Sequence, residues 1–340
     1  MPPRPAEAGA QQDGGVQTER VNWRPIVIYV LLADALAWVL CLPLWLGRGL
    51  NEAPEVLIPV LLGMMFMPAV AAAITLKLVE RKPFWRTVGA VVPRPLPRWF
   101  AYLAIAVGGI FALVLGALLT SRLLGQYQWD LANLSGFREA LEHQLRDRVK
   151  GGQVDLPPQT WLLALATIPN LLIASVINTI PAAGEEIGWR GFLFPRLQPL
   201  GTWPAIVVSG AIWGTWHAPV ILLGYNYQSV PPWLGLVLMV VFCTLCGGFL
   251  AWLRVRSASV WPAALGHGTL NAAVGATAAT FSLAGHPVNT ANGTIMGWAG
   301  WIVPLIVVAV LVATGKFVPK GADAAKDAGI SGPAVSSERP

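Results

Sequence analysis

The chain has 340 residues, of which 55% are hydrophobic and only 12% are charged. Soluble domains carry about 25% charged residues, so this composition excludes a chain made mainly of water-facing globular domains. The formal net charge of +6 accompanies no basic patch with interleaved aromatic residues. We therefore expect no nucleic-acid partner, and we assign the excess charge to cytoplasmic Lys and Arg beside membrane helices, with the lipid bilayer as the partner.

Apolar runs separate the charged segments, and each run is long enough to cross a bilayer, which takes about 20 residues. In chain order they predict an all-α bundle of about eight transmembrane helices, at 25–46, 55–78, 100–123, 161–197, 203–223, 232–253, 260–281 and 297–314. The fourth is expected to become more polar after residue 180. The bundle would occupy residues 25–315, between disordered cytoplasmic tails at 1–24 and 316–340.

The distribution of Lys and Arg supports this number of helices. With eight spans, most basic residues of the loops fall on one side, and the loops around Asn51, Asn226 and Asn289 on the other side nearly lack them. The basic group comprises Arg20, Arg24, Lys77, Arg81, Lys82, Arg86, Arg94, Arg98, Arg190, Arg196, Arg254, Arg256, Lys316 and Lys320. The positive-inside rule then predicts a multi-pass protein of the cell membrane with both termini in the cytoplasm.

The loop between the third and fourth predicted spans contains an amphipathic pattern. Leu134, Phe137, Leu141 and Leu145 recur at helical spacing beside a charged face. This pattern predicts a helix that lies on the outer membrane surface or over the bundle, and a solvated loop helix is the alternative.

The densest group of ionisable side chains within the apolar runs lies in the segment AAGEEIGWRGFLFPRL, residues 182–197. Ionisable groups at membrane depth are costly and therefore mark candidate functional sites. Glu186 precedes Arg190 by one helical turn, the favourable order for an ion pair that keeps Glu186 ionised and structural. Glu185 points about 100° away from Glu186. Without an adjacent cation, Glu185 can lie against apolar groups and act as a general base.

Two further motifs lie in later predicted helices. His217 lies one turn after Trp213 and shortly before Pro219, which weakens the local helix. His267 and Asn271 lie one turn apart, and this pair can aim two donors at a developing oxyanion, provided that His267 presents an N–H. A lone intramembrane His or Asn can instead bond a neighbouring helix, at about 0.6 kcal/mol. A carboxylate, two histidines and an asparagine on three separate helices together favour a common site.

Together and in this order, the three segments resemble the CPBP family of intramembrane proteases. That family includes type II CAAX prenyl endopeptidases and bacteriocin-processing or self-immunity proteins, and its pattern is EExxxR, FxxxH and HxxxN. The matching residues here are Glu185, Glu186 and Arg190, then Trp213 and His217, then His267 and Asn271. Trp213 replaces the usual Phe, a change that we expect the chemistry to tolerate. The resemblance covers about residues 160–280, the expected catalytic core.

The resemblance implies an intramembrane endopeptidase that hydrolyses a peptide bond of a membrane-associated or prenylated CAAX-type protein or peptide. Glu185, assisted by His217, would activate a water molecule. His267 and Asn271 would stabilise the tetrahedral oxyanion, while Glu186 and Arg190 hold the frame.

Metal dependence stays open at this point, because the family has been described both as metalloproteases and as glutamate proteases. The chain has no HExxH helix. Glu185, His217 and His267 could form a His₂Glu zinc site with an open position. Metal-free catalysis, which requires no cofactor, is favoured by Asn271 beside His267.

Two other classes of function compete with the enzyme. A non-proteolytic immunity or scaffold protein would tolerate replacement of Glu185 or His217. A transporter is suggested by Asp34 within the first helix, but the chain lacks the internal repeats typical of transporters. Asn170 and Asn178 are interpreted as structural polar groups.

Overall fold

The computed structural model describes residues 20–148, 156 and 159–317, and these residues form an all-α protein. Within them, the only β pairing is an isolated bridge between Trp129 and Ser282. The predicted fold class is therefore confirmed. The predicted tails lie almost wholly outside the described residues.

Eight long helices occupy the predicted positions. They are α1 (Trp23–Leu46), α2 (Pro54–Thr75), α4 (Leu96–Leu123), α6 (Thr160–Glu186), α8 (Thr202–Trp216), α10 (Pro232–Ser257), α11 (Trp261–Phe281) and α13 (Ile302–Ala313). Further helices connect them, namely α3 (Phe84–Thr87), α5 (Ser135–Arg148), α7 (Phe194–Leu197), α9 (Ala218–Ile221) and α12 (Thr290–Gly293). Two π-helical turns, Leu76–Glu80 and Ile187–Leu193, extend α2 and α6.

Six segments of the described chain are long and apolar enough to cross a membrane. They are Trp23–Leu46, Pro54–Glu80, Leu96–Leu123, Thr160–Leu200, Pro232–Ser257 and Thr290–Ala313. The other two long helices are α8, which has only 15 residues, and α11, which carries His267 and Asn271. The predicted number of eight is therefore approximate, because α8 is too short for an ordinary span and α11, although it has 21 residues, is not apolar enough.

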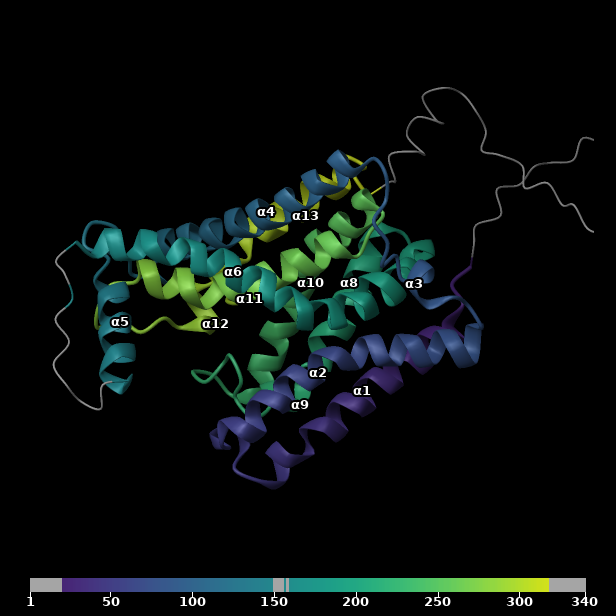
Figure 1. Ribbon diagram of the computed structural model, residues 1–340, viewed down its shortest axis with the longest axis horizontal. Helices are drawn as coiled ribbons and strands as arrows, with labels where there is room; N and C mark the ends of the chain where they lie inside the picture. Colours follow the sequence, from purple (N-terminus) through teal and green to yellow (C-terminus); the bar gives the residue numbers. More distant parts are fainter. Residues whose placement is uncertain (1–19, 149–155, 157–158, 318–340) are drawn as a thin grey trace, which may run out of the picture.

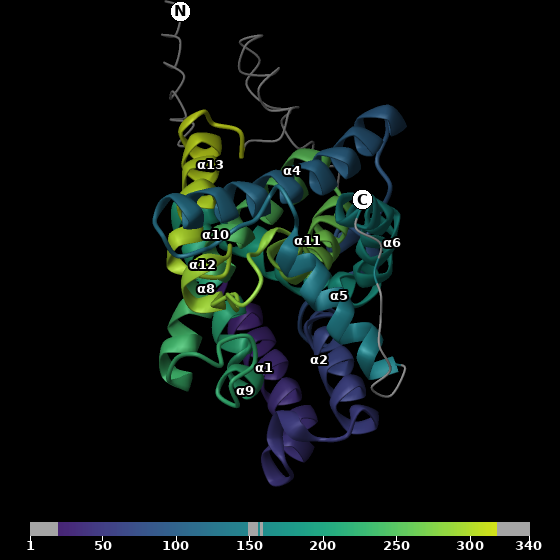
Figure 2. The same cartoon turned by 90° about the vertical axis from the view of Figure 1, so that its left-hand side faces the viewer.

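The helices pack as a bundle in which α6 and α11 lie side by side (Figure 1). In both views α1 and α2 form an antiparallel pair at one edge, and α4 and α13 lie at the opposite edge (Figure 2). Helix α2 contacts α6, and α8 packs against α10. The segment with the Glu pair and the segment with His267 therefore belong to neighbouring helices.

Two glycines let α6 approach its neighbours α11 and α2 closely. A Cβ on Gly268 of α11 would lie 2.6 Å from the backbone nitrogen of Thr179 on α6. A Cβ on Gly184 would lie 2.6 Å from the carbonyl oxygen of Met65 on α2. Small residues at such crossings allow membrane helices to pack backbone against backbone.

The fifth predicted helix is broken where the sequence places His217. Helix α8 ends at Trp216 and the short helix α9 follows at Ala218–Ile221, so the predicted span over 203–223 is interrupted beside Pro219, where the sequence predicted a weakened helix. Pro219 lies in α9 and has no backbone N–H to continue the α8 hydrogen-bond ladder. The break places His217 at a helix junction.

The amphipathic loop helix is α5, and it packs against α6 and α11. Leu134 and Phe137 are buried. The backbone nitrogen of Gly136 donates to the carbonyl of Ser282 at 3.0 Å, and the nitrogen of Ala284 donates to the hydroxyl of Ser135 at 3.1 Å. Of the predicted locations, the structure favours a helix over the bundle rather than a solvated one.

Candidate active site

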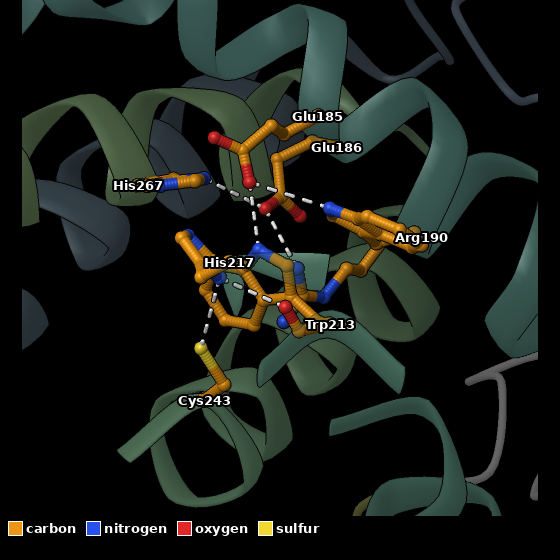
Figure 3. Close-up of polar contacts among 8 residues, drawn as sticks. Glu185, Glu186, Arg190, Trp213, His217, Cys243 and His267 are labelled. Carbon is orange, nitrogen blue, oxygen red and sulfur yellow. Dashed lines mark hydrogen bonds and ion pairs between the residues drawn. The ribbon is translucent and has the colours of Figure 1, made fainter. Parts of the chain in front are cut away.

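The last turn of α6 carries two adjacent glutamates that face different surroundings. Glu185 and Glu186 are both buried, with exposed fractions of 2% and 0%. Neighbours on a helix point about 100° apart, so one carboxylate borders a cavity and the other points into the packed interior (Figure 3). The two therefore have separate hydrogen-bond partners, as the sequence predicted.

Two indole groups hold the carboxylate of Glu185. Nε1 of Trp213 donates to Oε2 of Glu185 at 2.6 Å, and Nε1 of Trp189 donates to the same oxygen at 3.3 Å. Both bonds go to Oε2, which leaves Oε1 for a water molecule in the cavity. Glu185 is thus a hydrogen-bonded carboxylate, whereas the sequence suggested contact with apolar groups alone.

Glu186 binds a cation and a histidine through one oxygen. Nη1 of Arg190 lies 2.8 Å from Oε1 of Glu186, which confirms the predicted ion pair. Nδ1 of His267 lies 2.9 Å from the same oxygen. The guanidinium of Arg190 also lies over the ring of Trp213, 4.1 Å from its centroid. A cation against an indole face is a favourable contact, so Arg190 links the two glutamate environments.

The tautomer of His217 follows from its backbone contact. Nδ1 of His217 lies 2.8 Å from the carbonyl oxygen of Trp213, which can only accept a hydrogen bond. Nδ1 therefore carries the proton, and Nε2 of the neutral ring presents a lone pair. The ring also packs edge-on against Trp216, at 5.0 Å between centroids. His217 is thus oriented as a proton acceptor.

His267 and Asn271 lie one turn apart on α11, as predicted, but they differ as donors. Since Nδ1 of His267 donates to Glu186, Nε2 of His267 carries a proton only when the ring is an imidazolium. Asn271 is exposed to the cavity, and its amide N–H groups are donors at every pH. The oxyanion role predicted from the sequence requires His267 to present an N–H. In this structure Nε2 meets that requirement only when the ring is charged.

One cavity of about 530 Å³ brings four predicted residues together. Glu185, His217, His267 and Asn271 all line it, from α6, the α8–α9 junction and α11. Glu186 and Arg190 are buried and do not line the cavity. Asn178, interpreted from sequence as structural, also lines the cavity, and its Nδ2 donates to the carbonyl of Ala174 at 2.9 Å. Asp34 and Asn170 do not line this cavity.

The zinc set considered from the sequence can be tested against the donor positions. Within the described residues, no group of three or more His, Cys, Asp and Glu side chains is arranged to hold a metal ion. Oε2 of Glu185 is already bonded to two indoles. The Nδ1 contacts of His217 and His267 are of a kind that metal-bound histidines also make, so the placement of the side chains decides the question. In this arrangement Glu185, His217 and His267 do not fit a zinc site, and no catalytic step is routed through a metal here.

Comparisons with known proteins point to the same segment. The profile of the type II CAAX prenyl endopeptidase Rce1-like family matches residues 164–273. A curated relative is CAAX prenyl protease 2 of Methanococcus maripaludis, 38% identical over 50 residues. That alignment covers 14% of this chain and 18% of the relative, so it spans less than a fifth of the relative's length.

The matched segment, residues 164–273, covers most of α6, all of α8 and α10 and most of α11, and it contains all six predicted site residues. Sequence analysis missed the role of two tryptophans in this segment. Trp189 follows Glu185 by one turn, and Trp213 precedes His217 by one turn. The replacement of the family's Phe by Trp213 is not merely a change between aromatic rings, because the indole N–H reaches Glu185.

Proposed function

We propose that the chain is an intramembrane endopeptidase that uses Glu185 to activate water. The observation that supports this proposal most is the shared cavity, which brings Glu185, His217, His267 and Asn271 together from three parts of the chain. The match of residues 164–273 to an endopeptidase family adds independent support. The substrate is a membrane-associated protein or peptide, and a prenylated CAAX-type protein is one candidate.

The first step is attack of water on the scissile carbonyl. Oε1 of Glu185 and Nε2 of His217 are two acceptors that can position a water molecule in the cavity. As the water oxygen bonds to the carbonyl carbon, Glu185 takes one water proton. The two indole bonds to Oε2 keep the carboxylate in place while Oε1 faces the water.

The second step is collapse of the tetrahedral intermediate. The amide of Asn271 donates to the oxyanion, and Nε2–H of His267 adds a second donor when that ring is charged. The C–N bond then breaks, and the proton held by Glu185 passes to the leaving amine. Glu186 and Arg190 do not touch the substrate in this scheme; they fix the ring of His267 and the indole of Trp213.

Mass spectrometry of new protein N-termini tests the proposal even while the substrate is unidentified. Membranes from cells that make the unaltered chain are compared with membranes containing the Glu185→Gln variant. The control is Glu55→Gln, which changes an exposed glutamate in the first turn of α2. We expect a set of new termini that disappears with Glu185→Gln and persists with Glu55→Gln. Identical sets in all three samples would favour the immunity or scaffold function.

A further inference from the structure

Arg254 is a half-buried cation without a partner. It lies in the last turn of α10, and its guanidinium has five N–H donors. Nε is buried without an acceptor, and no hydrogen bond or ion pair among the described residues involves the two Nη groups, which are not sealed from the surface. The guanidinium lies against Gly89, where a Cβ would find no room. A charge that has lost part of its water in this way is stable only when it is paired, so Arg254 needs an anion.

The main chain around Arg254 is fixed by contacts between two distant segments. The backbone nitrogen of Val260, after α10, donates to the carbonyl of Gly89 at 2.9 Å. The hydroxyl of Ser259 donates to the carbonyl of Val91 at 2.8 Å. Gly89 and Val91 belong to the connection between α3 and α4, which lies at the end of the bundle where α4 begins (Figure 1). The surroundings of Arg254 are therefore a fixed part of the fold.

The two segments that meet here carry positive charge alone. Residues 84–99 and 252–261 contain no Asp or Glu, and their basic residues are Arg86, Arg94, Arg98, Arg254 and Arg256. The acidic residue nearest to either segment in the described sequence is Glu80, which is already paired with Arg196 at 2.6 Å. These segments therefore offer Arg254 no carboxylate, and its anion must come from outside them.

This part of the molecule lies at the level of the lipid headgroups. The span-length helix α10 ends here and α4 begins here, and Nη2 of Arg98 donates to the carbonyl of Arg256 at 2.9 Å across the junction. Trp85 is exposed, and Trp99 and Trp261 are partly exposed. Trp residues at the ends of transmembrane helices mark the membrane interface. That interface is the layer in which the phosphate groups of phospholipids lie.

Apolar side chains next to these arginines in the chain are exposed. They are Val91, Val92, Leu96 and Phe100, at the end of the connection between α3 and α4 and in the first turns of α4. A soluble anion such as inorganic phosphate would use only the guanidinium. A phospholipid offers a phosphate and acyl chains together, so it matches both the cation and the apolar surface beside it.

We propose that Arg254 binds the phosphate of an anionic phospholipid, whose headgroup lies between Gly89 and the end of α10. The planar guanidinium can donate to two phosphate oxygens at once. The uncompensated charge of the two segments favours a lipid with net negative charge over a zwitterionic one. Neither Arg254 nor Gly89 lines the catalytic cavity. This lipid site is therefore separate from the proposed endopeptidase function and does not depend on it.

Native mass spectrometry of the purified, detergent-solubilised chain measures this binding directly. Phosphatidylglycerol is titrated into the unaltered chain, into Arg254→Gln and into the control Arg48→Gln, which changes an exposed arginine after α1. We expect Arg254→Gln to bind the first phosphatidylglycerol at least about tenfold more weakly, the scale of one hydrogen bond to a charged group. Arg254→Lys keeps the charge without the bidentate geometry and should fall in between. Equal affinity of the unaltered chain and Arg254→Gln would overturn the proposal.

Thermal unfolding separates the lipid from a free anion and from a structural role of Arg254. Phosphatidylglycerol should raise the unfolding temperature of the unaltered chain and of Arg48→Gln, but not of Arg254→Gln, and phosphatidylcholine should not distinguish the three. Without lipid the three should unfold at similar temperatures, because the Arg254 guanidinium makes no hydrogen bond or ion pair within the described residues. A loss of stability in lipid-free Arg254→Gln would assign the arginine a structural role. Equal stabilisation by inorganic phosphate would assign the site to a free anion, and either result would overturn the proposal.

Discussion

The indole Nε1 of Trp213 donates a 2.6 Å hydrogen bond to Oε2 of Glu185. Glu185 is 2% exposed and forms no ion pair among the described residues. A buried carboxylate without a cation depends on its hydrogen bonds, which are worth about 1.5–3 kcal/mol each when one partner is charged. Trp213 therefore positions the group that we propose as the general base, from a helix 28 residues away in the sequence.

Replacement of Trp213 by Phe isolates this hydrogen bond. The Trp213→Phe variant keeps an aromatic ring under Arg190 but loses the donor to Glu185. We expect kcat to fall roughly 10- to 100-fold, the range that corresponds to about 1.5–3 kcal/mol, with KM nearly unchanged. The measurement is steady-state cleavage of an identified substrate in proteoliposomes.

The matched control for this variant is Trp252→Phe. Nε1 of Trp252 is buried without a hydrogen-bond partner, so its removal takes away no bond. We expect kcat of this control to stay unchanged. A loss of kcat equal to that of Trp213→Phe would show that the effect comes from indole packing.

The ion pair behind the cavity should control stability. Arg190→Met leaves the fully buried carboxylate of Glu186 without its cation, and such losses cost about 3–5 kcal/mol. The control is Arg146→Met on α5, whose exposed contact with Glu142 is worth about 1 kcal/mol or less. We expect thermal unfolding in detergent to shift clearly for Arg190→Met alone. Equal shifts for the two variants would contradict the structural role of the Glu186–Arg190 pair.

We expect His217 to contribute to catalysis through Nε2, the ring nitrogen that does not contact the carbonyl of Trp213. His217→Ala removes the Nε2 lone pair that accepts from water, and general base assistance typically contributes 10²- to 10⁴-fold. We predict a loss of kcat of at least about 100-fold, with unchanged thermal stability. His143→Ala, in the exposed part of α5, serves as the control and should retain full activity. Retained activity in His217→Ala would remove this residue from the mechanism.

The crossing of α6 and α11 depends on Gly268. In Gly268→Ala, the added Cβ would lie 2.6 Å from the backbone nitrogen of Thr179, and backbone atoms cannot move aside cheaply. Overpacking of this kind costs about 1–3 kcal/mol. Gly108→Ala on α4 adds a Cβ with nothing within 4 Å, so it should stabilise the helix by about 0.5–1 kcal/mol. Thermal unfolding of the two variants should therefore move in opposite directions, and a stabilised Gly268→Ala would contradict the close crossing.

Metal chelation tests the donor arrangement of the cavity. Because Glu185, His217 and His267 are not arranged as a metal site, we predict that cleavage persists after prolonged treatment with EDTA and 1,10-phenanthroline. Loss of activity that is restored by stoichiometric zinc would show that these side chains rearrange around a metal.

The sequence predicted those features that depend on local spacing. The apolar runs located the long helices, and the one-turn spacing of Glu186 and Arg190 predicted their ion pair. The bond between His267 and Glu186 joins residues 81 positions apart, and no local pattern encodes it. The hydrogen bond from Nε1 of Trp213 to Glu185 also joins residues far apart in the sequence. It was missed because Trp213 was interpreted only as an aromatic ring and not as an N–H donor. Pro219 predicted a weakened helix near His217, and the structure shows an interruption between α8 and α9 at that residue.

The most direct test of the central claim is single-turnover cleavage by purified protein in proteoliposomes. The unaltered chain and the Glu185→Gln variant are compared after equal thermal stability has been established. If Glu185 activates the attacking water, the variant cleaves at least about 100-fold more slowly, the usual scale for loss of a general base. Cleavage at the unaltered rate by the folded variant would contradict the mechanism.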